Sequence, residues 1–250
     1  SDVCSSDLGD RTVARNLIRA LERYNAVTVA SRFCSRDGAG DPVRQHRLSA
    51  LGDKFSARLI RRWTDAGDIP DAWFTYHVYH KAPDLLGPAV SKAFDIPYFM
   101  AEVSHAPKQA GGRWDIGYRA AEAAMRNADG IFGLSSLDAA CVMPLLADPE
   151  RYHHLAPFTV TAPLVAAART GPGEGDESCN RCRIDPESDL RLAVGMMRDG
   201  DKLASYRVLA DALARIADHD WTLLVAGDGP ARADVEAAFD GLAPNRVVYA

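Results

Sequence analysis

The feature that most constrains the fold is a regular alternation of short apolar segments with longer amphipathic segments along the chain. The apolar segments, such as "IPYFMAEVS" at residues 96–104, are short and bounded by turn residues, which is typical of buried strands. The segments between them, such as "GYRAAEAAMRNAD" at residues 117–129, repeat apolar residues at the spacing of an α-helix. Because the connections are short, the strands must be parallel and joined by helical crossovers, so the sequence predicts an α/β fold.

The alternation falls into two groups of elements, separated by residues 161–189. In the first group we expect strands at residues 26–33, 71–80, 96–104, 130–135 and 154–160, and helices at residues 10–23, 47–67, 84–95, 117–129 and 136–146. In the second group we expect strands at residues 190–197, 221–227 and 246–250, and helices at residues 202–218 and 232–242. Residues 161–189 carry Gly, Pro, Ser and charge with weak periodicity, which predicts a linker between two domains.

The two ends of the chain affect the expected domain boundaries. The first eight residues, "SDVCSSDL", match the translation of a common sequencing adapter, so we exclude residues 1–8 from fold reasoning as non-native. The last residues, "NRVVYA", have the pattern of a strand that has just begun. We therefore expect a fragment cut at both ends, with an N-terminal domain over residues 9–160 that lacks its first strand. The C-terminal domain, residues 190–250, would be incomplete and would expose a sheet edge and one apolar sheet face.

Composition and charge argue against several functional classes. A net charge of −5 and a pI of about 5.8 make nucleic-acid binding an improbable main function, although a local basic site for a phosphate stays compatible with them. The five cysteines are an odd number in a long chain, which argues against a secreted disulfide framework. The sequence has no apolar run long enough to span a membrane and no signal-peptide pattern, so we expect a cytoplasmic protein.

The stretch "WTLLVAGDGPARADVEAAF" at residues 221–239 places Gly227 and Gly229 at the end of an expected buried strand. Ligands of parallel sheets bind beyond the carboxyl ends of the strands, and a residue without Cβ lets a ligand approach the main chain closely. Pro230 suits the first turn of the following helix, whose free N–H groups favour an anion. The motif lacks the third glycine of the G-x-G-x-x-G pattern, and a tight turn without a ligand explains it equally well.

A second loop, "GMMRDGDK" at residues 195–202, follows the preceding expected strand and carries Arg198 and Lys202. Adjacent parallel strands end at the same edge of a sheet, so we expect these two cations near the glycine loop. Two cations beside a helix N-terminus can hold a diphosphate. Either residue alone is better explained as solvated surface charge, whereas the combination favours a functional site.

These two loops together resemble the donor-binding half of the retaining glycosyltransferases of family 4. The family pattern is Val-Gly-Arg-Leu, then a Lys-Gly, then a strand that ends in Gly-x-Gly-Pro; here Met196 stands at the position of the arginine, and Arg198 is the substitute. The resemblance is strongest over residues 192–239 and implies the GT-B architecture, in which two Rossmann-like domains face a cleft. The donor-binding residues that it implies are Gly9, Arg198, Lys202, Gly227, Asp228 and Gly229.

The resemblance also carries expectations about the chemistry. Enzymes of this kind need no metal, and the nucleotide-sugar is a substrate, so we expect no cofactor. Their Glu-x7-Glu motif, which holds the donor sugar and ribose, should lie beyond Ala250. We therefore expect residues 9–250 by themselves to be inactive.

Polar residues follow two expected strands of the first domain, where the sheet edge should open. His77 and Lys81 come at the end of the strand at residues 71–80, and Ser104 and Lys108 follow the next strand; these four are acceptor-side candidates. The candidate catalytic residues are Glu102 and His105, which would orient the sugar or the acceptor. The resemblance implies a histidine near the donor sugar here, and His105 comes about two residues late for it.

Other clusters give weaker hypotheses. His77 and His80 with Glu102 are a conceivable metal set, but a spacing of three along a strand points the two rings to opposite faces. Cys179 and Cys182 form a lone C-x-x-C motif, which we interpret as incidental.

The leading hypothesis is a glycosyltransferase that moves a sugar from a nucleotide-diphosphate donor to an acceptor, with retention of configuration and without a metal. The acceptor would be a glycan, a lipid-linked molecule or a small molecule, and peripheral membrane association stays open. The alternatives are a sugar-nucleotide epimerase of the same fold and a non-catalytic nucleotide-binding α/β module.

Overall fold

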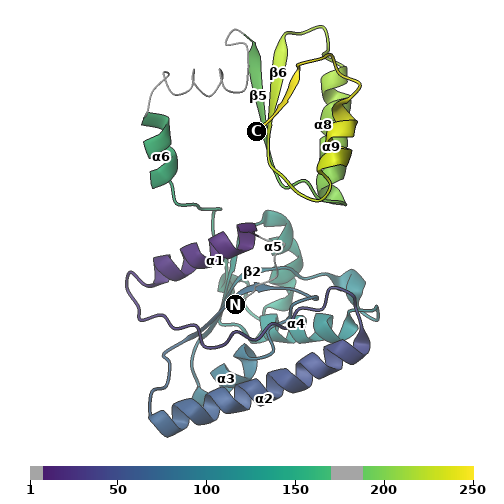
Figure 1. Ribbon diagram of the computed structural model, residues 1–250. Coiled ribbons are helices and arrows are strands. Elements are labelled where there is room, and N and C mark those ends of the chain that lie inside the picture. The colour runs from purple at the N-terminus through teal and green to yellow at the C-terminus, as the bar shows by residue number, and fades with distance from the viewer. Residues whose placement is uncertain (1–7, 170–187) are drawn as a thin grey trace. The chain divides into compact units, whose positions relative to one another are not determined.

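The computed structural model of this 250-residue chain describes residues 8–169 and 188–250. The chain divides into two compact units, unit 1 (Ser1–Val160) and unit 2 (Thr161–Ala250). Each unit contains one parallel sheet with helices packed against it (Figure 1). The predicted α/β class is therefore confirmed. No helix within the described ranges is long and apolar enough to cross a membrane.

The sheet of unit 1 has the strand order β1-β2-β3-β4, and every neighbouring pair is parallel. The strands are β1 (Trp73–Val78), β2 (Tyr98–Val103), β3 (Gly130–Gly133) and β4 (Tyr152–His154). The first three lie inside the ranges expected from the sequence. The fourth shares only His154 with the expected range of 154–160, so the predicted strand at residues 155–160 is wrong.

The helices of unit 1 are α1 (Leu8–Leu21), α2 (Pro42–Ala66), α3 (Gly87–Phe94), α4 (Asp115–Asn127) and α5 (Ser136–Val142). Short 3-10 turns follow strands and helices at η1 (Pro107–Gln109), η2 (Met143–Leu145) and η3 (Pro149–Arg151). The core between sheet and helices contains fully buried Val78, Met100, Met125 and Ile131, among others. These residues come from the apolar positions that predicted the elements.

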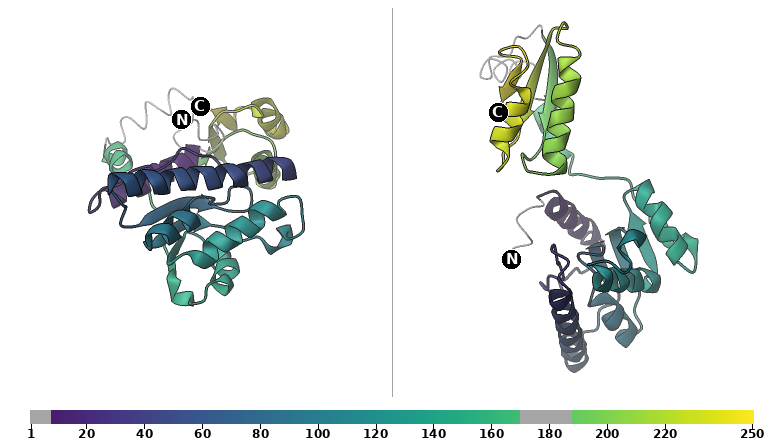
Figure 2. Two further views of the ribbon diagram at one scale, coloured as in Figure 1. Left: turned by 90° about the horizontal axis from the view of Figure 1, so that it is seen from below. Right: turned by 90° about the vertical axis from the view of Figure 1, so that its right-hand side faces the viewer.

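The long helix α2 lies along the outside of unit 1 (Figure 2). It begins earlier than the sequence predicted, because Asp41 caps its first turn by accepting the Val43 amide at 2.9 Å and Pro42 occupies the first helical position. It ends as predicted at Gly67, which adopts a φ of 65° in the left-handed region that favours glycine.

The predicted strand at residues 26–33 is wrong. This segment is extended but pairs with no strand in the described ranges, and Val29 is 65% exposed. Ala30 and Phe33 pack against the core of unit 1, so the apolar pattern reflects burial without sheet pairing. β-propensity reports a local preference, whereas a strand also needs a neighbouring edge that offers free N–H and C=O groups.

Unit 2 has a three-stranded parallel sheet in the order β5-β6-β7. Its elements are α6 (Ala162–Arg169), β5 (Asp189–Val194), α8 (Asp201–Ala214), β6 (Trp221–Ala226), α9 (Arg232–Phe239) and β7 (Val247–Tyr249). Helix α6 occupies the start of residues 161–189, the segment predicted to be a linker. Cys179 and Cys182 lie outside the described residues.

Both long helices of unit 2, α8 and α9, cover the same face of the sheet (Figures 1 and 2). The core on that face contains Leu203, Tyr206, Leu223, Val225 and Phe239. On β5 the alternate residues Leu190, Leu192 and Val194 are 44%, 64% and 75% exposed. One apolar stripe of the sheet is therefore uncovered by the described residues.

Candidate functional site

Two loops at the carboxyl edge of the unit 2 sheet are joined by main-chain hydrogen bonds. The loop after β5 donates from Gly195 N to Ala226 O at 3.1 Å and from Met197 N to Asp228 O at 2.9 Å. The loop after β6 returns a bond from Ala231 N to Met197 O at 3.0 Å. The hydrogen-bond ladder thus continues beyond the strand ends, and the two loops form one rigid unit.

The glycines of the second loop have a structural reason for having no side chain. A Cβ on Gly227 would lie 1.9 Å from Gly195 O, and a Cβ on Gly229 would lie 2.1 Å from Met197 O. No real Cβ tolerates such an approach to a backbone atom. The close approach that the sequence motif predicted therefore occurs between the two loops, whereas the approach of a ligand stays a prediction.

The first loop is fixed from the side of the core. The Met197 side chain is completely buried, and the Tyr206 hydroxyl donates to Gly195 O at 3.0 Å. The following residue, Arg198, is exposed. The buried Met197 side chain therefore fixes the main chain from which the exposed Arg198 side chain extends.

Helix α8 begins at this loop without a side-chain cap. Gly200, with a φ of 80°, is the residue before the helix, and no side chain caps the helix N-terminus. Among the described residues, the amides of Asp201 and Lys202 have no hydrogen-bond partner. The side chains of Arg198 and Lys202 are exposed and make no ion pair there either. A helix N-terminus with open amides beside two cations is suited to bind an anion.

Asp228 stabilises the turn of the second loop, and its side chain is 81% exposed. Its carboxylate accepts the Gly229 amide at 2.8 Å and lies 3.8 Å from the Arg232 guanidinium. Arg232 in turn bonds Glu236 at 2.8 Å. These contacts are exposed, so they set the turn without storing much energy.

In unit 1, two predicted site residues adopt unusual backbone conformations at neighbouring positions. His77 on β1 has a φ of 62° and Glu102 on β2 has a φ of 53°. Left-handed backbone costs about 1–2 kcal/mol for residues with a Cβ, and such residues concentrate at functional sites. The Tyr76 hydroxyl donates to the Glu102 carboxylate at 2.5 Å. Glu102 is thereby held at the sheet edge with a fixed orientation.

His105 lies in a side-chain network instead of an open site. Its side chain is 7% exposed, Nδ1 lies 3.2 Å from Cys141 O, and Nε2 lies 3.1 Å from the Tyr118 hydroxyl and 3.3 Å from Glu122. Because a carbonyl oxygen only accepts, the contact with Cys141 O is a hydrogen bond in the tautomer that carries a proton on Nδ1. The hydrogen bonds from Tyr118, Arg126 and His105 lower the pKa of Glu122 to about 2. His105 thus ties the loop after β2 to helices α4 and α5.

The remaining candidates are placed as follows. Ser104 is exposed, and its amide continues the sheet ladder by donating to Val78 O at 2.9 Å. Gly9 lies in the first turn of α1. Lys81 and Lys108 lie near His80, which has a buried Nδ1 without a hydrogen-bond partner. No three His, Cys, Asp or Glu side chains converge as metal ligands in the part of the chain that the structure describes.

Sequence reasoning did not identify Arg113 and Trp114. The indole ring of Trp114 carries the ammonium group of Lys81 at 4.7 Å and the guanidinium group of Arg113 at 4.3 Å from its centre. The pair Arg113-Trp114 follows two glycines, which was a weak local signal of a loop. Its meeting with Lys81 depends on the fold.

The sequence matches no protein-family model and no curated protein. The structure, however, is similar to solved structures. A glycosyltransferase from Rickettsia africae ESF-5 is similar with a TM-score of 0.59 at 12% identity, over 94% of this chain and 57% of that chain. An α,α-trehalose-phosphate synthase (UDP-forming) from Burkholderia vietnamiensis is similar with a TM-score of 0.57 at 12% identity, over 82% and 53%.

A third structure, described as trehalose-6-phosphate from E. coli bound with UDP-2-fluoro glucose, has a TM-score of 0.52 at 9% identity, over 100% of this chain and 72% of that chain. At such low identity these similarities show the fold alone. The chain has two parallel Rossmann-like α/β sheets and shares the GT-B fold with glycosyltransferases. It spans about half the length of the first two proteins.

Proposed function

We propose that this chain belongs to a glycosyltransferase that moves a sugar from a nucleotide-diphosphate donor to an acceptor, with retention and without a metal. The observation that carries the proposal is the joined loop pair of unit 2, with open α8 amides beside Arg198 and Lys202. The shared fold supports it, because two of the similar proteins carry UDP in their names or ligands. Membership of family 4 is part of the same proposal.

The proposed chemistry needs fixed positive groups more than a side-chain acid or base. As the bond from sugar to diphosphate breaks, negative charge grows on the leaving diphosphate. Arg198, Lys202 and the first amides of α8 would stabilise that charge, and a rigid loop needs no reorganisation during the reaction. The main-chain bonds from Gly195 and Met197 supply this rigidity.

The proposed roles in unit 1 concern the sugar and the acceptor. Glu102 would accept hydrogen bonds from sugar hydroxyls, since its carboxylate is already oriented by Tyr76. His105 was predicted for the same task, and its contacts with Cys141 and Glu122 give it a positioning role in addition. The acceptor would be bound on the unit 1 side.

The direct test is a titration of the chain with UDP, measured by isothermal titration calorimetry. We expect Arg198→Ala and Lys202→Ala each to weaken UDP binding about tenfold, as for the loss of one charge-assisted hydrogen bond. Arg207→Ala is the matched control, because Arg207 is an exposed cation on the same helix, beyond its first turn. Uridine, which lacks the diphosphate, should bind far more weakly than UDP. Equal binding of uridine and UDP, or variants that match the wild type, would refute the proposed donor site.

Product analysis separates the proposal from its alternatives, provided that the assayed protein also contains the expected Glu-x7-Glu motif, because we expect residues 9–250 by themselves to be inactive. A glycosyltransferase releases free UDP and a glycosylated acceptor from a UDP-sugar. An epimerase of the same fold converts the sugar nucleotide into an isomer without any acceptor. A binding module returns the sugar nucleotide unchanged, although it still binds UDP.

A further inference from the structure

A cluster of cations surrounds one tryptophan where the chain leaves β1 and β2 of unit 1. We call His80, Lys81, Lys108, Arg113 and Trp114 the Trp114 cluster. Lys81 and Arg113 both lie against the Trp114 ring, and the charges of Lys81 and Lys108 both act on the His80 ring. Among the described residues, none of the three cations makes an ion pair with a carboxylate. Like charges that converge without a partner repel one another and favour a bound anion.

The cluster is held in place by the main chain. The Asp37 amide donates to Lys81 O at 2.8 Å, and the Trp114 indole donates to Asp37 O at 3.0 Å. Gln45 adds a bond from its side-chain amide to Arg113 O at 2.8 Å. The segments that carry Lys81 and Arg113 are therefore tied to one another through Asp37 before any ligand arrives.

The buried Asp37 carboxylate beside the cluster already accepts hydrogen bonds. The Asp37 side chain is 3% exposed, and its two oxygens accept the amides of Ala39 at 3.1 Å and Asp41 at 2.8 Å. The Arg44 guanidinium lies 4.0 Å from the same carboxylate. Its negative charge is thus compensated locally and does not neutralise the cluster.

His80 contributes an unused polar atom. Its Nδ1 is buried without a hydrogen-bond partner, which costs free energy unless a ligand or water binds there. Burial first, and then the charges of Lys81 and Lys108, lower the pKa of His80, so its ring is neutral near pH 7. His80 and Lys81 also line a cavity of about 80 Å³ together with Ser35, Asp37 and Gln45, whereas Lys108, Arg113 and Trp114 lie outside its lining.

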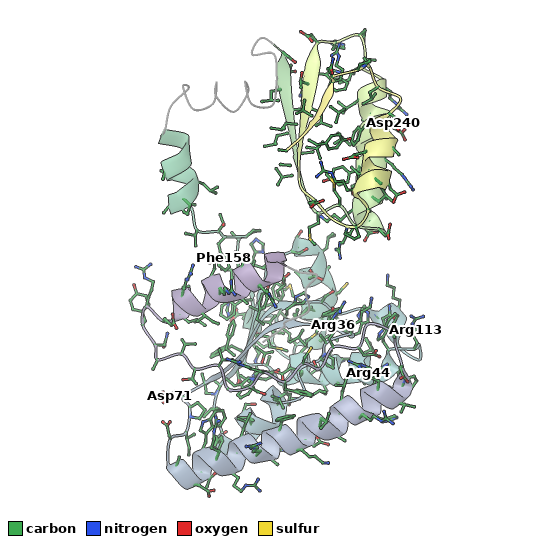
Figure 3. The ribbon with its side chains drawn as sticks, viewed as in Figure 1. Arg36, Arg44, Asp71, Arg113, Phe158 and Asp240 are labelled. Carbon is green, nitrogen blue, oxygen red and sulfur yellow. The ribbon has the colours of Figure 1, made fainter. Side chains whose placement is uncertain are left out.

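The basic surface extends beyond the cluster. Figure 3 shows Arg36, Arg44 and Arg113 at the same end of unit 1. The Arg44 guanidinium donates to Arg36 O at 3.5 Å, so these side chains come from neighbouring segments. Because Arg44 already lies beside the Asp37 carboxylate, the anion site rests on the cations of the Trp114 cluster and not on Arg36 or Arg44.

We propose that the Trp114 cluster binds the phosphate group of a phosphorylated acceptor. That the phosphate belongs to the acceptor rests on the proposed function, whereas the anion site itself does not. A phosphate dianion matches three unpaired cations better than a carboxylate does, because it brings twice the charge and three acceptor oxygens. Trp114 holds Lys81 and Arg113 in position and offers a flat surface beside the bound group.

The test is a titration of the chain with inorganic phosphate in which NMR monitors the indole N–H resonance of Trp114. The resonance is assigned by its absence from the spectrum of the Trp114→Phe variant. We expect a saturable shift in the millimolar range and a dissociation constant about tenfold higher in Lys108→Ala and in Arg113→Ala. Both side chains are exposed, so the fold should persist, as thermal unfolding would verify. Lys54→Ala, an exposed lysine on α2 outside the cluster, should bind phosphate like the wild type.

Several results would overturn the inference. Unchanged phosphate binding in both variants would show that the cluster is not the site. An equal response to acetate at equal ionic strength would show that the site does not select phosphate. Because no donor is present, the result is independent of sugar transfer. Phosphate binding without UDP binding would leave the cluster as an anion site and remove the proposed function. UDP binding without phosphate binding at the cluster would remove only this inference.

Discussion

Units 1 and 2 build the carboxyl edges of their parallel sheets from different atoms. In unit 2 the loops after β5 and β6 are joined by main-chain bonds, and Gly227 and Gly229 are needed because the loops touch. In unit 1 side-chain contacts add to the main-chain bonds of the corresponding edge, through the His105–Glu122 network and the Trp114 cluster. The contrast teaches that substitutions in unit 2 should act through backbone geometry, and those in unit 1 through charge.

The largest expected effect is at Gly227. Gly227→Ala would place Cβ 1.9 Å from Gly195 O, so the loops must separate and unit 2 should lose about 3 kcal/mol of stability. Gly241→Ala is the matched control, because a Cβ there meets nothing within 4 Å and should change stability by no more than about 0.5 kcal/mol. Hydrogen exchange of the β6 amides measures both. Equal protection in the two variants would show that the loops do not depend on each other.

A smaller effect is expected in the side-chain network of unit 1. Glu122→Gln removes the charge that bonds Arg126, so we expect a loss of about 1–2 kcal/mol at pH 7. Because folding lowers the pKa of Glu122 from 4.5 to about 2, the stabilisation is complete above the higher value and disappears as pH falls toward the lower one. Urea unfolding of the wild type and Glu122→Gln at pH 7 and pH 3, monitored by tryptophan fluorescence, tests whether the stabilisation by Glu122 shrinks in acid.

The comparison with unit 2 supplies the control for that prediction. Glu236 bonds Arg232 at 2.8 Å, but both side chains are about 40% exposed, so Glu236→Gln should cost at most about 0.5 kcal/mol. If the cost at Glu122 is no larger than at Glu236, or does not shrink in acid, the network is not a stabilising element of unit 1.

The smallest effect is expected on the uncovered face of the unit 2 sheet. Leu192 is 64% exposed on β5, so Leu192→Thr should change stability by less than about 0.5 kcal/mol. Leu223 lies on β6 and is 1% exposed, so Leu223→Thr should lower the free energy of unfolding by several kcal/mol. Urea titration compares the two. A large loss at Leu192 would mean that this face is covered in solution.

Much of the fold could be predicted, because local patterns determine most of it. The apolar spacing gave the positions of β1, β2, α4 and α8, and Gly67 gave the end of α2. Residues 26–33 could not be assigned in the same way. Their composition is that of a strand, but whether a segment pairs depends on an edge supplied from elsewhere in the fold.

The candidate site was predictable only in part, because the sequence shows local patterns but not the partners that the tertiary structure supplies. The two glycines after β6 were recognised as special from sequence, yet the atoms that exclude a side chain at Gly227 and Gly229 belong to Gly195 and Met197, each thirty-two positions earlier. His105 was recognised by its place after β2, whereas its contacts with Cys141 and Glu122 arise from helices later in the chain. Trp114 was missed because its meeting with Lys81 is created by tertiary structure. Sequence patterns located residues that matter, and the structure supplied their partners.

The central claim is that the joined loops of unit 2 bind the diphosphate of a sugar donor. The most direct measurement is an amide chemical-shift map of the isotopically labelled chain during titration with UDP, with uridine as the reference. The account predicts that UDP-specific shifts concentrate at residues 195–203 and 227–231, strongest at the open amides of Asp201 and Lys202. Shifts that appear equally with uridine, or that leave both loops unchanged while UDP binds elsewhere, would contradict it.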